Sequence, residues 1–160
     1  MTGIWVALSK QVSTELIRKA LLQWFPLSAN CTQAEAYNSK EEWPPIVFSV
    51  SETKADDFPV MIGFDAFPGD PSIAESVSSA LGRKFASEFQ CRSLCEAPGL
   101  ANDGSPYWSL LWANGEPFLA DDCHSKLVDG EGGDVRVVRK IDVALVELDD
   151  AGALVLRHAG

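Results

Sequence analysis

The sequence has few histidines, no long apolar run and no excess of positive charge. Only His124 and His158 occur in 160 residues, so imidazole is scarce for catalysis or metal binding. No apolar run approaches the ~20 residues of a membrane-spanning helix, and we expect no membrane segment. The N-terminus, MTGIWVALSKQ, lacks a basic region and a small-residue cleavage site. We therefore expect a cytoplasmic protein.

Acidic residues outnumber basic ones. Thirteen Lys and Arg face 23 Asp and Glu, which gives a net charge of −10. Binding to phosphates requires clustered cations, so we expect neither nucleic acid nor an anionic membrane as a partner. An acidic surface favours a basic protein partner because opposite charges speed encounter, although the same charge also serves solubility.

The length predicts a single domain over residues 1–160. A domain of this size buries roughly 70% of its unfolded surface, so it requires no disulfide, metal or cofactor to fold. We interpret the four cysteines as free thiols; they are Cys31, Cys91, Cys95 and Cys123.

Hydrophobic periodicity predicts the secondary structure of the first half of the chain. The apolar run 4–9 indicates a strand, and apolar residues four apart within 9–25 indicate an amphipathic helix. Residues 26–45 are polar and proline-containing, which predicts a long loop. Strands are expected at 45–52 and 58–67, joined by the short charged linker ETKADD.

A second helix and several strands are predicted for the rest of the chain. Ser72-x-x-Glu75 matches a capping box, and an apolar stripe then runs every fourth residue from Ile73 to Phe89. Residues 91–97 fit either a short strand or a continuation of that helix.

The C-terminal part is rich in turn signals. Asn114-Gly115 between two apolar runs predicts a hairpin, and DGEGGD (129–134) predicts a flexible acidic loop. The β-branched run 135–148 predicts one strand, which a turn at 149–152 connects to a last strand at 153–158.

The element order β-α-β-β-α-β predicts an α+β fold. We expect a ferredoxin-like split β-α-β start, with two helices on one face of an antiparallel sheet. The C-terminal hairpins either extend that sheet or form a second layer.

One group of side chains resembles metal ligands or a thiol catalyst. Cys91 and Cys95 have suitable spacing for zinc, but Cys123 and His124 are adjacent and would point to opposite faces of a strand, so we predict no metal site. Cys123 and His124, oriented by Asp121 or Asp122, could instead form a thiol nucleophile and its base. No glycine-rich phosphate loop occurs in the chain.

A binding surface is the other hypothesis. Trp108 and Trp112 lie four apart on one strand and therefore share a face. They are either core residues or, if that face is open, aromatic anchors of a protein-binding site. Acidic residues around them would steer the partner; these are Glu116, Asp121, Asp122, Asp129, Glu131 and Asp134.

The hairpin SPYWSLLWANGEPFLADD turns at Asn-Gly and ends in Asp-Asp. In this acidic α+β chain it resembles bacterial immunity proteins against contact-dependent and polymorphic toxins, over about residues 70–125. The resemblance implies a cofactor-free, stoichiometric inhibitor that binds a cognate toxin domain, often a basic nuclease, and blocks its active site. An enzyme using Cys123 and His124, or a self-associating assembly subunit, are the alternatives.

Overall fold

The structure is a computed structural model that describes residues 2–26, 32–33, 46–68, 73–96 and 108–156. Its elements in chain order are β1 (Ile4–Leu8), α1 (Thr14–Trp24), β2 (Thr32–Gln33), β3 (Val47–Glu52), β4 (Val60–Ala66), α2 (Ala74–Phe89), β5 (Ser93–Glu96), β6 (Trp108–Ala113), β7 (Glu116–Asp121), α3 (Lys126–Asp129), β8 (Arg136–Lys140), β9 (Val146–Leu148) and β10 (Leu154–Leu156).

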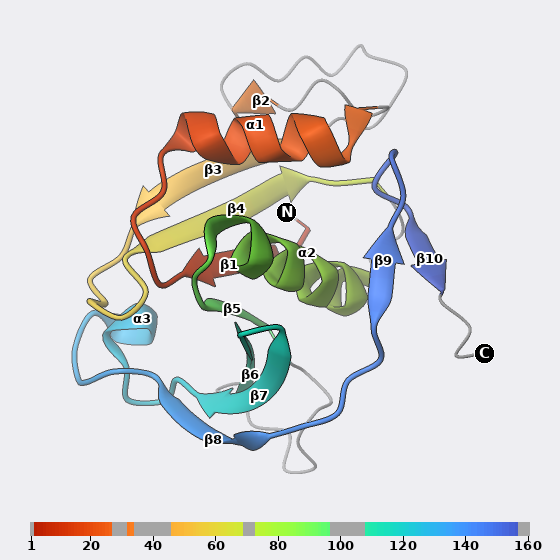
Figure 1. Cartoon of the computed structure of the whole chain (residues 1–160). Coiled ribbons are helices and arrows are strands. Elements are labelled where there is room, and N and C mark those ends of the chain that lie inside the picture. Colours follow the sequence, from red (N-terminus) through yellow and green to blue (C-terminus); the bar gives the residue numbers. More distant parts are fainter. Residues whose placement is uncertain (1, 27–31, 34–45, 69–72, 97–107, 157–160) are drawn as a thin grey trace.

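The strands form one large sheet in the order β2-β3-β4-β1-β5-β6-β7-β8, and β9 pairs with β10 separately. Every pairing is antiparallel except that of the two-residue β2 with β3. The split β-α-β start is confirmed, because β4 lies between β3 and β1, and β5 pairs with the free side of β1. The β6–β7 hairpin and β8 extend the sheet, whereas the last hairpin lies apart from it (Figure 1).

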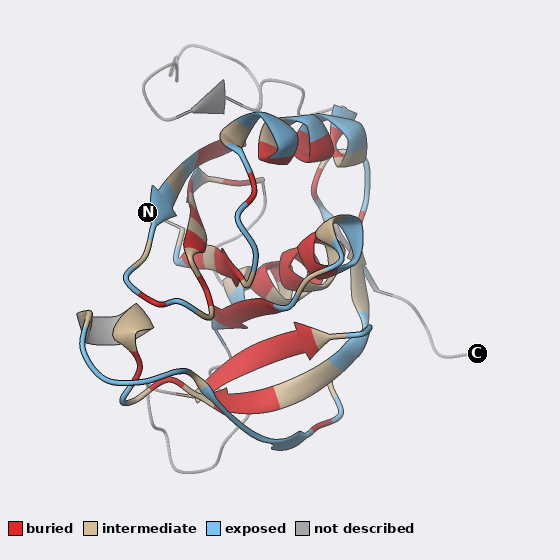
Figure 2. Cartoon of the chain, turned by 60° about the vertical axis from the view of Figure 1, so that its left-hand side comes forward, coloured by how far each residue is buried: buried red, intermediate tan, exposed pale blue. Residues whose placement is uncertain are grey.

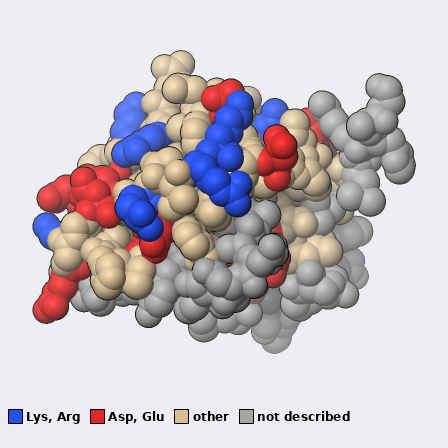
Figure 3. Space-filling model, turned by 90° about the horizontal axis from the view of Figure 1, so that it is seen from below, with Lys and Arg blue, Asp and Glu red and all other residues tan. Residues whose placement is uncertain are grey.

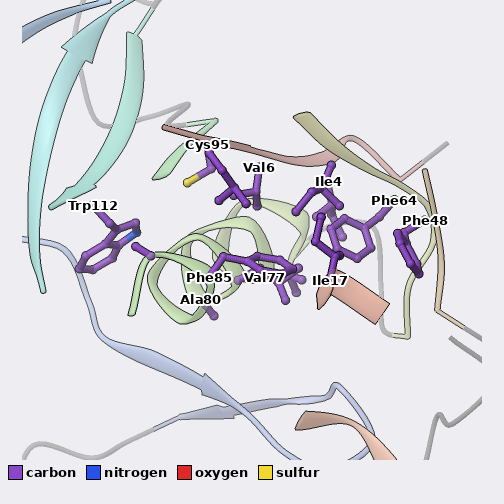
Figure 4. Packing of buried hydrophobic residues seen from close by; sticks show 14 of the residues in the cluster. Ile4, Val6, Ile17, Phe48, Phe64, Val77, Ala80, Phe85, Cys95 and Trp112 are labelled. Carbon is purple, nitrogen blue, oxygen red and sulfur yellow. The ribbon is translucent and has the colours of Figure 1, made fainter. Parts of the chain in front are cut away.

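The two long helices cover the same face of the sheet, as the α+β prediction requires (Figure 1). Their inward residues, including Ile17 and Phe85, pack with every second residue of β1 and β4 into the main core (Figure 4). A second, smaller cluster lies on the opposite face around Phe58, Leu94 and Leu111. Figure 2 shows that burial is concentrated between the helices and the central strands. Apolar side chains therefore stabilise both faces of the central sheet.

Side-chain and backbone caps define the helix ends. Ser13 caps α1 by accepting a hydrogen bond from the Leu16 N–H at 3.3 Å. Gln90 ends α2 in the left-handed conformation at φ 50°, after which β5 begins. The strand alternative for 91–97 is therefore the observed one. The proposed capping residue Ser72 lies outside the described residues, as does most of the loop predicted over 26–45.

The single strand predicted over 135–148 is wrong. β8 ends at Lys140, and β9 begins only at Val146. The cause is the length of the neighbouring strand β7, which begins only at Glu116. After Lys140 the chain makes one more backbone bond to it, from Ile141 N to Pro117 O at 3.1 Å. Beyond that point β7 offers no further backbone to pair with. A β-branched composition predicts a strand only where a partner backbone is present.

None of the helices in the described part of the chain is both long and apolar enough to cross a membrane.

Candidate functional site

The β6–β7 hairpin places the two tryptophans on the helix side of the sheet. Asn114 and Gly115 have φ of 52° and 77°, the paired left-handed geometry of a tight hairpin turn. Trp112 is only 1% exposed, and Trp108 is half-buried against the same core. The core alternative is thus the one observed for Trp112, and the exposure that a role as an anchor requires is missing there.

Two of the predicted steering carboxylates are engaged by the neighbouring strand β8. Glu116 accepts a bond from Lys140 Nζ at 2.7 Å, and Asp121 Oδ2 pairs with Arg136 at 3.0 Å. The pKa of Asp121 is lowered, first by the Cys123 N–H that donates to its Oδ1 and then by Arg136. Both carboxylates are thus paired with cations of β8, which reduces the free negative charge that they offer to a partner.

Asp122 is buried rather than presented to a partner. It is 7% exposed, and its Oδ2 accepts a bond from the Ser109 hydroxyl at 2.8 Å. Its Oδ1 has no hydrogen-bond partner in the described part of the chain. Burial raises the pKa of this carboxyl, and the Ser109 bond only partly opposes the shift. The assignment of Asp122 to a steering surface therefore does not fit its position.

Replacing Asp122 with asparagine is expected to stabilise the protein at pH 7. A folded-state pKa above the unfolded value means that this group favours folding when protonated, and that this contribution is lost as pH rises through the folded pKa. The advantage of Asp122→Asn should therefore vanish below about pH 3.9, where the unfolded carboxyl is also protonated. Urea denaturation of both proteins at pH 7 and pH 3.5 measures this. A less stable variant at pH 7 would mean that the ionised bond to Ser109 outweighs burial.

The segment after β7, which includes the predicted acidic loop 129–134, folds back on itself. Gly133 N donates to His124 O at 2.9 Å, and Lys126 N donates to Gly133 O at 3.1 Å, which closes the short helix α3 into a compact turn. Gly130 and Gly132 make this possible because both have left-handed φ, 79° and 97°. Three acidic residues are therefore carried on a defined backbone, although the side chain of Asp129 lies outside the described part.

This turn is fixed against the β3–β4 loop, 78 positions away in sequence. Val135 N donates to Asp57 Oδ2 at 2.8 Å, and Lys126 approaches Asp56 to 3.9 Å. Leu127 and Val135 also pack on the second apolar cluster beside Phe58. The two segments thus form one surface of the molecule.

We define the acidic corner as Asp56, Glu131 and Asp134, three exposed carboxylates carried by the two segments that this contact joins. Figure 3 shows acidic side chains gathered at the side where α3 lies in Figure 1. Lys54 and Lys126 also lie in this region and offset part of the charge. Sequence reasoning found Glu131 and Asp134 but missed Asp56, whose only signal was the charged linker ETKADD.

The Cys123–His124 pair lies in the turn that follows β7. Because the residues are not on a strand, their side chains do not point apart as predicted; Cys123 Sγ and His124 Nε2 are 3.9 Å apart. Within the described ranges, no three Cys, His, Asp or Glu side chains gather as metal ligands. Cys95 is fully buried in the main core, where burial raises its pKa.

A cavity of about 680 Å³ lies between the end of α2 and the β6–β7 turn. Arg83 lines it with its guanidinium 5.9 Å from the centre of the Trp112 ring, and Cys91 lies beside it. Burial raises the pKa of the Cys91 thiol. The described lining residues include no Asp, Glu or His, so they offer no acid–base pair there.

Compared with family models, curated proteins and solved structures, the chain shows no significant match.

Proposed function

We propose that this chain is a cytosolic immunity protein that binds and neutralises a basic toxin domain at the acidic corner. The observation that carries the proposal is the contact of two acidic segments, 78 positions apart, through the bond from Val135 to Asp57. The resemblance of the β6–β7 hairpin to toxin-immunity proteins supplies the class of partner. The mechanism is occlusion: the inhibitor covers the toxin's active site and requires no cofactor.

The charge distribution supports this location. Glu116 and Asp121 are paired with cations of β8, and Asp122 is buried. Asp56 has a side chain that is 92% exposed although Lys126 approaches it to 3.9 Å, and Glu131 and Asp134 are exposed as well. Exposed carboxylates attract a basic partner and orient it before contact, so the corner is suited to steering.

Co-expression with the product of the adjacent gene tests the proposal, because an immunity gene is expected beside its toxin gene. The neighbouring product should arrest bacterial growth, and this chain should restore it. The variant Asp56→Asn/Glu131→Gln/Asp134→Asn should lose most of that protection, since it removes the exposed carboxylates while leaving the Asp57–Val135 bond intact.

A matched control removes the same number of charges elsewhere. Asp65, Glu88 and Asp150 are exposed carboxylates outside the corner, and the variant Asp65→Asn/Glu88→Gln/Asp150→Asn should protect as well as the natural chain. Equal protection by both triple variants would refute a role for the corner. A harmless neighbouring product would refute the immunity function itself.

The 3.9 Å approach of Cys123 to His124 favours one alternative, a thiol-dependent enzyme. A catalytic thiol has a depressed pKa, so iodoacetamide should then label Cys123 much faster than it labels glutathione at pH 7, and His124→Ala should abolish the excess. For a binding protein we expect labelling of Cys123 at an ordinary rate, and labelling of the buried Cys95 only after unfolding. Peptide-level mass spectrometry separates these sites.

A further inference from the structure

The strand β8 is an exposed edge of the large sheet. It pairs with β7 on one side, and no strand of the described chain pairs with its other side. All five of its residues are exposed, among them Val137 at 44% and Val138 at 39% (Figure 2). An edge strand of this kind presents outward backbone N–H and C=O groups on which a further strand can form.

The side chains of β8 divide between the two faces of the sheet. Arg136 and Arg139 lie opposite Asp121 and Leu119, on the face that carries the helices. Val137 and Lys140 lie opposite Ala120 and Phe118, on the other face. Val138 is the extra residue at the irregularity in register between these pairs. A strand added to this edge therefore meets two guanidinium groups on one face, and Val137 together with Lys140 on the other.

We propose that β8 binds an extended segment of a partner protein in which acidic and apolar side chains alternate. Acidic residues of such a segment would lie beside Arg136 and Arg139, and its apolar residues beside Val137. Arg136 remains accessible although it pairs with Asp121, because its side chain is 69% exposed. Figure 3 shows basic side chains gathered in the middle of the face seen from below.

A second copy of this chain is a poorer occupant of the edge. Two β8 strands paired antiparallel about Val138 would bring Arg136 of one copy opposite Lys140 of the other, and both ends of the pair would repeat this opposition. Like charges directly opposite in a sheet are destabilising. This proposal does not rest on the acidic corner, which requires a basic surface on its partner.

The test uses the full chain, labelled with nitrogen-15, and two capped nine-residue peptides. One alternates glutamate with valine and the other alternates lysine with valine. The glutamate peptide should shift the amide signals of residues 136–140 and slow their hydrogen exchange, whereas the lysine peptide should bind at least several-fold more weakly. Shifts confined to other elements, or equal binding of both peptides, would overturn the proposal.

Charge reversal of the edge sharpens the result. Arg136→Glu/Arg139→Glu should weaken binding of the glutamate peptide by roughly tenfold or more and should strengthen binding of the lysine peptide, since attractive cross-strand pairs become repulsive. Arg139→Glu alone leaves the Asp121 pair intact and should give a smaller change in the same direction. The matched control is Arg18→Glu/Lys19→Glu on α1, which should bind as the natural chain does.

An unchanged affinity in both edge variants would overturn the proposal. So would sedimentation of the peptide-free chain as a dimer whose β8 amides are protected from exchange, because a second copy would then occupy the edge.

Discussion

Replacing Trp112 with alanine is expected to destabilise the protein by about 3–5 kcal/mol, the usual loss when a buried tryptophan is truncated. The indole is 1% exposed and lies against α2 at Gly82, where a Cβ would come within 3.2 Å of its Cδ1 (Figure 4). Because the surroundings of a truncated core side chain relax only partially, a cavity is expected to remain. Urea denaturation at neutral pH measures the change.

Two further variants test whether the loss of stability comes from the buried ring of Trp112. Trp112→Phe keeps an aromatic ring and removes an indole N–H that has no hydrogen-bond partner in the described part of the chain, so it should cost clearly less than alanine. Trp108→Ala should also cost less, because Trp108 is only half-buried. If Trp112→Ala left stability unchanged but abolished partner binding, Trp112 would be an exposed anchor and its place in the core would be contradicted.

Alanine at Gly132 is expected to open the turn that carries the acidic corner. Gly132 has φ 97°, and a Cβ there would lie 2.1 Å from the carbonyl oxygen of His124, which is closer than any real contact. Backbone strain of this kind costs about 1–3 kcal/mol, and the turn can relieve it by breaking the bond between Gly133 N and His124 O. Hydrogen exchange should show lost protection of the Gly133 and Lys126 amides.

The neighbouring glycine is the control. A Cβ at Gly133 would meet no atom within 4 Å, so Gly133→Ala should keep both the protection of those amides and binding to the partner. Gly132→Ala should weaken partner binding because Glu131 and Asp134 lose the fixed position that the closed turn gives them. Identical behaviour of the two variants would show that the closed turn does not hold the acidic corner together.

Local patterns in the sequence were sufficient for most of the fold. The Asn114-Gly115 pair fixed the hairpin because its turn geometry depends on those two residues alone, and the apolar stripe of α2 placed its buried face. Where strand length depended on a partner, as after Lys140, the pattern overestimated it. The composition of a segment indicates whether it can form a strand, and the length of the neighbouring strand determines where that strand ends.

The candidate site was less predictable, because its charges depend on contacts far apart in sequence. The sequence predicted Glu116 and Asp121 as steering charges, but in the structure they pair with Lys140 and Arg136 of β8. In the sequence Asp56 is part of a charged linker, and in the structure the bond from Val135 to its neighbour Asp57 connects that linker with the segment after β7. Carboxylates near a turn can be paired, buried or exposed, and only the tertiary structure distinguishes these three states.

The central claim is that the acidic corner steers a basic partner, and the salt dependence of the association rate tests it most directly. Stopped-flow mixing of the chain with the purified product of the adjacent gene should give a rate constant that falls steeply from low to high ionic strength. The variant Asp56→Asn/Glu131→Gln/Asp134→Asn should associate roughly tenfold more slowly at low salt, with a much flatter salt dependence. If this variant and the natural chain showed the same rates and the same slope, the acidic corner would not be the docking surface.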